Sequence, residues 1–334
     1  MNIADYKGVW VFAEQRDGIL QKVSLELLGK GKEIAEKLGV ELTAILLGSN
    51  VDKLAEELVA FGADKVLVAN SHLLKHFTTD AYTKVIAQLV KERKPEVILV
   101  GASYLGRDLA PRLAARLVTG LTADCTGLDV DMTTRNLLQT RPAFGGNIMA
   151  TIECPDHRPQ MSTVRPGVFE KLARDNQAKG TIEEVKFELE ESDIRTKVVE
   201  AVKSLKDIMD ISEAKIIVSG GRGVGTKENF ALLKELAEVL GGSVAASRAA
   251  VENGWVDKAF QVGQTGKTVR PNLYIACGIS GAIQHLAGMQ DSDYIIAINK
   301  DATAPIMGAA DLGLAGDLNR IIPELIAQIK AIKA

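Results

Sequence analysis

The stretch from Pro271 to Asn299 reads PNLYIACGISGAIQHLAGMQDSDYIIAIN, and its pattern is that of a strand, a loop, a helix and a second strand. Leu273–Ala276 is a short apolar run of strand-forming residues, and Gly278 ends it. The following apolar residues recur at the spacing of one helix face: Ile279, Ile283, Leu286 and Met289. Asp293–Asn299 then has the composition of a second buried strand. The second half of the chain is organised around this unit.

Polar residues gather where the first of these strands meets the helix. Ser280 is a good N-cap residue, and Gly281 leaves room for a ligand at the first turn. Free backbone N–H groups and the positive end of a helix dipole favour a phosphate at such a point. Gln284 and His285 follow about one turn further on. An ordinary strand-to-helix turn with a solvated histidine is the alternative explanation of the same residues.

Length and composition restrict the class of protein. The 334 residues are enough for two domains, each with its own core. With 46% apolar residues, 25% charged residues and a net charge of -3, the chain resembles a globular protein and lacks the basic excess of a nucleic-acid binder. The three cysteines form no CxxC pair, so no disulfide framework or zinc ribbon is indicated. Without a secretory signal or an apolar run of membrane-spanning length, we expect a cytoplasmic protein.

The first half of the chain alternates strand and helix patterns. The predicted strands are Gly8–Ala13, Glu41–Leu47, Lys65–Ala69 and Glu96–Val100. The predicted helices are Gln21–Leu38, Asp52–Phe61, Thr79–Arg93 and Gly106–Leu117. This alternation predicts an α/β fold with a mostly parallel sheet. Asn147–Glu153 and Gln160–Val164 alternate apolar and polar residues, so we expect both as antiparallel additions at one edge.

A charged segment from about residue 175 to 210 separates two domains. Few large apolar residues occur in it outside Val185–Leu189, so we interpret it as an edge strand followed by a linker with a hinge near residue 200. This predicts an N-terminal α/β domain over residues 1–200 and a C-terminal, doubly wound domain over residues 211–334. Besides the opening unit, the predicted strands of the second domain are Ala214–Ser219 and Ser243–Ala246, and its predicted helices are Lys227–Leu240 and Ile321–Lys333.

Loops with ligand-binding character follow the strands of the second domain. Gly220–Gly225 reads GGRGVG, which is neither the GxGxxG fingerprint nor a P-loop but can form a tight turn that aims Arg222 at a phosphate. The other loops contain Ser247 with Arg248, Val262–Lys267, and Asp301–Asp317. Loops after parallel strands meet at the carboxyl edge of a doubly wound sheet, so together they predict a dinucleotide site.

The same loops carry a family resemblance. LYIACGISGAIQHLAGM and DYIIAINKDATAPIMGAADLGLAGDL closely resemble the α subunit of electron transfer flavoproteins. VSGGRG, SVAASRAAV and VGQTGKTV match that family in the same order, as do GRDLAPRLAARLVTGLTADCTGL and TRPAFGGN in the first domain. The resemblance covers nearly the whole chain. It implies a subunit that pairs with a β subunit and holds one FAD in its C-terminal domain.

The resemblance also implies which residues contact FAD: Arg222, Ser247, Arg248, Val262, Gly263, Gln264, Thr265, Ser280, Gly281, Ala282, Ile283, Gln284, His285, Asn299, Asp317 and Leu318.

Residue types suggest roles within that set. Ser280 and Gly281 suit the pyrophosphate, and Asn299 and Asp317 the adenosine end. Thr265 is expected to donate a hydrogen bond to flavin N5. Arg248 is expected beside the isoalloxazine and His285 at the carbonyl at position two, where both would stabilise negative charge on the reduced ring.

The resemblance implies two kinds of redox partner. Ordinary members carry electrons from acyl-CoA dehydrogenases to a quinone reductase. A second group, in anaerobes, oxidises NADH and divides the electrons between ferredoxin and an acyl-CoA dehydrogenase in flavin-based electron bifurcation. GVWVFAEQRDG and TGLTADCTGLDVD favour the bifurcating group. The β subunit is then expected to hold a second FAD, where the ordinary carrier holds AMP.

Other candidate sites in the sequence are weaker. The segment Glu153–Arg158 and the pair His72 and His76 contain metal-ligand residue types, but their spacing favours a solvated loop and surface histidines, so no metal is predicted. A dinucleotide-dependent enzyme of related fold would need a catalytic lysine, for which Lys267 and Lys300 are the candidates. An ATP-binding module in the first domain is disfavoured because no phosphate-cradling glycine loop follows its strands.

Overall fold

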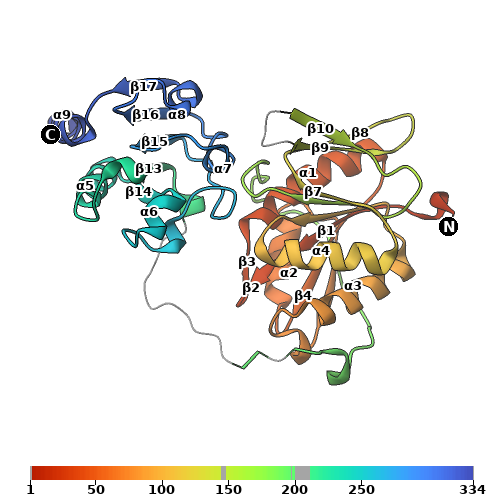
Figure 1. The fold of residues 1–334 in the computed structure, drawn as a ribbon. Coiled ribbons are helices and arrows are strands. Elements are labelled where there is room, and N and C mark those ends of the chain that lie inside the picture. Colours follow the sequence, from red (N-terminus) through yellow and green to blue (C-terminus); the bar gives the residue numbers. More distant parts are fainter. Residues whose placement is uncertain (1, 144–147, 197, 200–210, 334) are drawn as a thin grey trace. The chain divides into compact units, whose positions relative to one another are not determined.

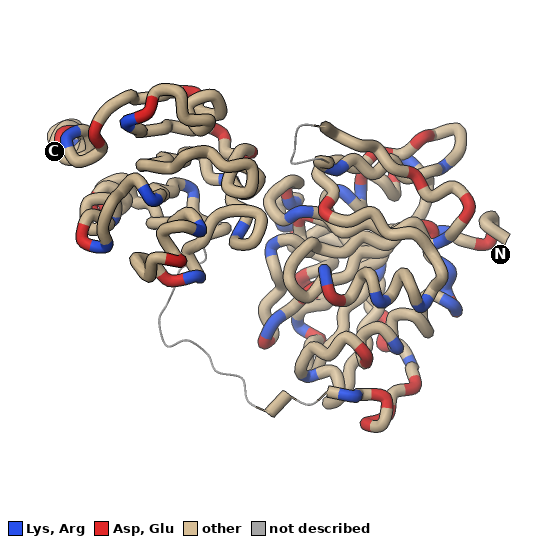
Figure 2. The backbone as a smooth tube through the Cα atoms, in the orientation of Figure 1, with Lys and Arg blue, Asp and Glu red and all other residues tan. Residues whose placement is uncertain are grey.

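The computed structural model describes residues 2–143, 148–196, 198–199 and 211–333. The chain divides into two compact units, Met1–Val202 and Lys203–Ala334 (Figure 1). The hinge predicted near residue 200 and the last four residues of TRPAFGGN lie outside the described residues. Acidic and basic residues are interspersed along the backbone of each unit (Figure 2), in keeping with the small net charge.

The first unit is built around a seven-stranded parallel sheet with the spatial order β12-β5-β4-β1-β6-β11-β7. Its strands are β1 (Val9–Ala13), β4 (Leu42–Gly48), β5 (Lys65–Asn70), β6 (Val97–Gly101), β7 (Leu121–Cys125), β11 (Gln160–Val164) and β12 (Thr181–Glu184). Its main helices are α1 (Lys22–Leu38), α2 (Asp52–Ala60), α3 (Thr79–Arg93) and α4 (Tyr104–Leu117). These elements confirm the predicted α/β class.

Helices cover both faces of this sheet. Side chains alternate along β1, so Val9 and Val11 join the core that α1 and α2 cover, whereas Trp10 and Phe12 join the core that α3 and α4 cover. Burial on both faces explains why the central strands are almost continuously apolar.

The prediction of an antiparallel edge strand at Gln160–Val164 is wrong. β11 pairs in parallel with β6 on one side and β7 on the other, and every residue in it is buried. Its polar residues have partners inside: the Gln160 side-chain Oε1 accepts a hydrogen bond from Leu137 N (2.8 Å), and Ser162 Oγ donates to Gln139 Oε1 (2.6 Å). The alternating pattern therefore reflects buried hydrogen bonds and not a solvated face.

A smaller antiparallel sheet accompanies the main one. It consists of β8 (Gly127–Val130), β9 (Leu137–Ala143) and β10 (Ile148–Ile152), in the order β10-β9-β8. The antiparallel prediction is thus correct for β10. The sequence patterns missed β7, β8 and β9, and also the short hairpin of β2 (Gln15–Arg16) and β3 (Ile19–Leu20).

Much of the predicted linker is anchored to the first unit. The edge strand β12 pairs with β5. It ends just before Val185–Leu189, the apolar residues on which the predicted edge strand was based. Lys65 Nζ bonds Glu183 at 2.6 Å, and Lys84 Nζ bonds Asp193 in a short 3₁₀ helix, also at 2.6 Å. Val185 itself is buried in the core under α3 and α4.

The second unit is a five-stranded parallel sheet in the order β14-β13-β15-β16-β17, which is the doubly wound order 2-1-3-4-5. Its strands are β13 (Ile216–Gly220), β14 (Ser243–Ala246), β15 (Leu273–Cys277), β16 (Ile295–Asn299) and β17 (Leu312–Ala315). Its helices are α5 (Phe230–Leu240), α6 (Arg248–Glu252), α7 (Ile283–Leu286), α8 (Pro305–Ala309) and α9 (Leu318–Lys333). Strand order reverses between β13 and β15, so a crevice is expected at their carboxyl ends.

The predicted helix after β15 is much shorter than its apolar spacing indicates. α7 covers four residues, its N-cap position is held by Ala282, and Ser280 caps nothing. Gly281 has φ +86°, which is not a helical value. Ile306 N donates to the Ser280 carbonyl at 3.1 Å, so this segment packs against the start of α8 and does not form a helix. Among the described residues, no helix is long and apolar enough to span a membrane.

Candidate functional site

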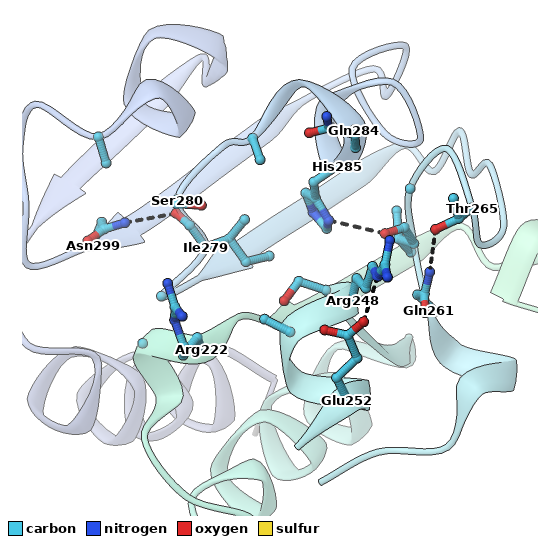
Figure 3. A pocket seen from close by; sticks show the side chains of 18 of the residues that line it. Arg222, Arg248, Glu252, Gln261, Thr265, Ile279, Ser280, Gln284, His285 and Asn299 are labelled. Atoms are coloured by element: carbon cyan, nitrogen blue, oxygen red, sulfur yellow. Dashed lines mark hydrogen bonds and ion pairs between the residues drawn. The ribbon is translucent and has the colours of Figure 1, made fainter. Parts of the chain in front are cut away.

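A cavity of about 520 Å³ opens at the carboxyl ends of the strands of the second unit. The loops that follow β13, β14, β15 and β16 all contribute to it, together with the segment around Val262 (Figure 3). This is the position that the strand order predicts for a ligand. Its lining residues that the sequence also predicted are Arg222, Ser247, Arg248, Val262, Gly263, Thr265, Ser280, Ala282, Gln284, His285 and Asn299.

The remaining predicted residues do not line the cavity. Gly281 packs its backbone against α8, and Leu318 is 3% exposed in the hydrophobic core. Asp317 accepts a hydrogen bond from Asn319 N (3.0 Å) at the start of α9, which lowers the pKa of its carboxyl, and it also pairs with Lys300 Nζ at 3.2 Å. Gln264 and Ile283 are exposed neighbours of the lining residues.

Several lining residues were not predicted as site residues: Gly223, Ala249, Glu252, Gln261, Gly278, Ile279, Asp301 and Ala304. Glu252 lies four residues after Arg248 on α6, a helix that the sequence analysis did not identify. Gln261 had only its position next to the Val262 loop to mark it. The periodicity of the sequence does not distinguish either residue from ordinary surface positions.

Two glycine-containing loops form the floor of the crevice. Gly221 N donates to the Cys277 carbonyl and Gly223 N to the Gly278 carbonyl, both at 2.9 Å. A Cβ on Gly221 would lie 2.3 Å from the Gly278 oxygen, so only glycine permits this approach. The GGRG sequence thus brings the loops after β13 and β15 into backbone contact.

One end of the cavity offers donors without acceptors. Within residues 211–333, the N–H groups of Ser280 and Ala282 donate no hydrogen bond, and the guanidinium of Arg222 forms no ion pair. Backbone N–H groups beside an arginine form an electropositive site suited to phosphate oxygens. The short α7 contributes little dipole, so this preference depends on the loop itself.

Asn299 connects this end to the floor. Its side-chain Nδ2 donates to the Ile279 carbonyl at 2.8 Å, and its Oδ1 accepts from Asp301 N at 3.0 Å. The Nδ2 bond therefore holds the loop after β15 to the end of β16, and the Oδ1 bond fixes the turn that follows β16. Asn299 shapes the cavity by fixing its walls.

A second arginine lies elsewhere on the cavity wall. Arg248 Nε bonds Glu252 Oε1 at 2.7 Å across one turn of α6 (Figure 3). Both side chains are exposed, at 66% and 60%, so solvent screens the pair and the arginine can exchange its partner for an anionic ligand at little cost.

His285 is buried between two fixed partners. Its Nδ1 lies 3.2 Å from the Val262 carbonyl oxygen, and its Nε2 lies 3.0 Å from Tyr274 Oη. A carbonyl only accepts, so Nδ1 carries the proton and the Tyr274 hydroxyl donates to Nε2. Burial lowers the pKa of His285 to about 4 and raises the pKa of Tyr274 above its ordinary value. His285 is therefore neutral at pH 7 and ties the Val262 loop to β15.

The other candidate sites show no ligand-binding geometry. Arg158 is 3% exposed and donates to the carbonyls of Cys154, Pro155 and His157, which makes Glu153–Arg158 a loop stabilised by its own arginine. Among the described residues, no group of three or more His, Cys, Asp and Glu side chains is placed to hold a metal ion.

The corresponding edge of the first unit does not suit a phosphate. Strand order reverses there between β1 and β6, and the carboxylate of Glu14 lies at this point, 1% exposed. It bonds Arg16 Nη2 at 2.7 Å and accepts a hydrogen bond from Ser103 Oγ. A buried carboxylate repels a phosphate, so this edge gives no support to an ATP site.

Two family models match the chain, one in each of its two units. A model of the electron transfer flavoprotein domain matches residues 9–190, and a model of the electron transfer flavoprotein FAD-binding domain matches residues 210–290. Over 333 residues the chain is 70% identical to the electron transfer flavoprotein subunit alpha of Clostridium acetobutylicum, and the match covers 99% of each.

Two further relatives bear more specific names. The chain is 49% identical over 356 residues to the acryloyl-CoA reductase electron transfer subunit beta of Anaerotignum propionicum, covering 98% of this chain and 97% of the relative. It is 46% identical over 325 residues to subunit LctC of a lactate dehydrogenase (NAD(+),ferredoxin) of Acetobacterium woodii, covering 97% and 77%. The motifs, the fold and these matches agree, and the chain belongs to the electron transfer flavoprotein family as an α subunit with an FAD-binding domain.

Proposed function

We propose that the cavity of the second unit binds one FAD and that this α subunit passes electrons within a cytoplasmic heterodimer. The observation that carries the proposal is that one cavity joins an electropositive end, at Arg222 and Ser280, to a wall that contains Arg248, Thr265 and His285. A dinucleotide needs both features, since its central pyrophosphate is anionic and each of its two ends is an uncharged ring system.

The residues present fit FAD. The unpartnered N–H groups of Ser280 and Ala282 would hold the pyrophosphate with Arg222, on the floor that Gly221 and Gly278 form. When bound, FAD supplies the capacity to take up and release electrons. Asp317 and Leu318, which lie outside the cavity, would contribute to the adenosine end only through an extension of the site along α9.

Three side chains set the environment of the flavin in this proposal. Arg248 brings positive charge, and Thr265 offers a hydroxyl to N5. His285 was expected to bond the carbonyl at position two, but both of its nitrogens already have partners within the protein. We infer that His285 acts chiefly by holding the Val262 carbonyl, and that it bonds FAD only by releasing Tyr274.

We further propose an electron transfer flavoprotein β subunit and an acyl-CoA dehydrogenase as partners. The β subunit would hold a second FAD, accept electrons from NADH and send part of them to ferredoxin. The names of two relatives support this proposal, because one belongs to an acryloyl-CoA reductase and the other to a lactate dehydrogenase that uses NAD(+) and ferredoxin. An ordinary carrier that serves a quinone reductase, with AMP in the β subunit, is the second candidate, and the name of the relative at 70% identity is compatible with both.

Visible spectra of the chain co-expressed with its β-type partner test these proposals. We expect two FAD per heterodimer and loss of the oxidised flavin absorbance on anaerobic addition of NADH. One FAD that does not respond to NADH but is reduced by an acyl-CoA dehydrogenase with its substrate would identify the ordinary carrier. A colourless heterodimer would contradict the FAD site itself.

A further inference from the structure

Gln261 holds the hydroxyl group that the proposed FAD site uses. Its side chain is 5% exposed, and its Nε2 lies 3.1 Å from Thr265 Oγ1 (Figure 3). Thr265 itself is exposed and lines the cavity. A buried amide thus supports an exposed hydroxyl on the wall of the site.

The backbone fixes Gln261 independently of any ligand. Its N–H donates to the Lys258 carbonyl at 3.1 Å, and its carbonyl accepts from Lys267 N at 2.7 Å. A Cβ on Gly266 would lie 2.3 Å from the Gln261 oxygen, so the turn that carries Thr265 closes tightly over Gln261. These contacts come from the chain itself and hold the amide group in position, as preorganisation of a site requires.

The direction of this hydrogen bond decides what Thr265 can do. A hydroxyl has one proton to donate and two lone pairs that accept. The Gln261 amide N–H occupies one lone pair and leaves the proton free for the cavity. Accepting a hydrogen bond also polarises the hydroxyl, which makes it a better donor.

We propose that Gln261 is a positioning residue that orients the Thr265 proton toward flavin N5. The inference rests on the proposed FAD site, and in it the Gln261 side chain acts through the hydroxyl group of Thr265. A hydrogen bond donated to N5 is stronger after the first electron has added negative charge to the ring. Gln261 therefore raises the potential of the first one-electron reduction of bound FAD.

Two near-isosteric substitutions test this role in the heterodimer. Gln261→Glu replaces an N–H donor by a carboxylate that only accepts, so it captures the Thr265 proton. Thr265→Val removes the hydroxyl. We expect each variant to retain FAD and to shift the first reduction equilibrium roughly tenfold toward oxidised flavin, about 59 mV for one electron. The ¹⁵N resonance of labelled N5 should move in the same way in both.

A double-mutant cycle separates positioning from charge. The new carboxylate repels the reduced ring whether or not Thr265 is present, so its effect in the Thr265→Val background measures charge alone. We expect that effect to be clearly smaller than in the wild-type background. Gln290→Glu, at an exposed position outside the cavity, should leave the potential unchanged.

The outcomes distinguish this inference from the proposed function. Additive effects of the two substitutions, or an N5 resonance that Gln261→Glu does not move, would overturn the positioning role while FAD stays bound. A wild-type heterodimer without FAD would instead overturn the proposed function. Thermal unfolding of each variant shows whether the fold is retained.

Discussion

His285 combines deep burial with two short contacts, and this has a thermodynamic consequence. Burial disfavours the charged ring, and the Tyr274 hydroxyl donates to the neutral one, whereas the Val262 carbonyl opposes this shift in part. The lowered pKa of His285 therefore makes the stability of the fold depend on pH, whatever role the residue has toward a cofactor.

We predict that the free energy of unfolding of the second unit rises between about pH 4 and 6.5 because of His285. Its pKa is about 4 in the folded protein, against the ordinary value of 6.5 that it regains on unfolding, so the unfolded chain binds more protons in this interval and stability increases with pH. The effect is roughly 3 kcal/mol at pH 7 and is lost as pH falls to 4. Urea unfolding at several pH values measures it.

The controls for this prediction use the same substitution at two histidines. His285→Gln should remove the pH dependence in this interval, whereas His157→Gln, at an exposed loop position, should leave it in place. An equal slope in both variants would assign the dependence to other groups.

At this scale the sequence predicted residues that follow strands and missed those that act through other residues. Arg222, Ser247 and Ser280 were predicted because strand ends meet at one edge of a parallel sheet. Gln261 and Tyr274 were not predicted because each acts through a single hydrogen bond, Gln261 to Thr265 and Tyr274 to His285. Such bonds depend on tertiary distances that no local pattern encodes.

At the scale of elements, the contact between the loops after β13 and β15 determines the crevice. The glycines there have negative φ at Gly221 and positive φ at Gly278, so the requirement for glycine at Gly221 is steric and not conformational. Its nearest neighbours would be backbone atoms, which have little freedom to move.

We predict that Gly221→Ala lowers the stability of the second unit by roughly 2–4 kcal/mol and weakens FAD binding, because the new methyl group separates the two loops. The matched control is Gly308→Ala on α8, where a Cβ meets nothing within 4 Å and stability should be equal or higher. Differential scanning calorimetry and FAD titration report both quantities. Equal behaviour of the two variants would contradict the steric argument.

Elements were predicted well where periodicity and burial agree and poorly where hydrogen bonds dominate. α3 has the predicted bounds because its apolar face and its first and last turns coincide with the pattern. The length of α7 was overestimated because Ile279 and Met289, which lie at helical spacing in the sequence, are buried in the core by non-helical segments on either side of α7. β11 was misplaced because buried Gln160 and Ser162 were taken for solvated residues.

On the scale of the whole molecule, each unit has its own pair of cores, and the described residues that line the cavity proposed for FAD all belong to the second unit. Ligand binding stabilises the state that binds it, by an amount set by concentration over the dissociation constant. The stabilisation should therefore be local to the second unit.

We predict that FAD slows amide hydrogen exchange in the loops after β13, β14, β15 and β16 and leaves β1 and β6 of the first unit unchanged. Exchange measured by mass spectrometry, before and after FAD is restored to the flavin-depleted protein, checks this expectation. Uniform protection of both units would show that the cofactor site extends beyond the second unit.

The place of β11 in the first sheet also bears on how the chain is assembled during synthesis. Among the described strands of the seven-stranded sheet, β7 pairs with β11 alone, which is made some forty residues later and must enter between β6 and β7. Until β11 is made, β7 has no strand to pair with in that sheet, and the Gln139 side chain lacks the hydrogen bond that Ser162 donates. The β6–β11–β7 side of the first sheet therefore cannot be completed on the ribosome until β11 emerges, because contacts of long sequence separation form late.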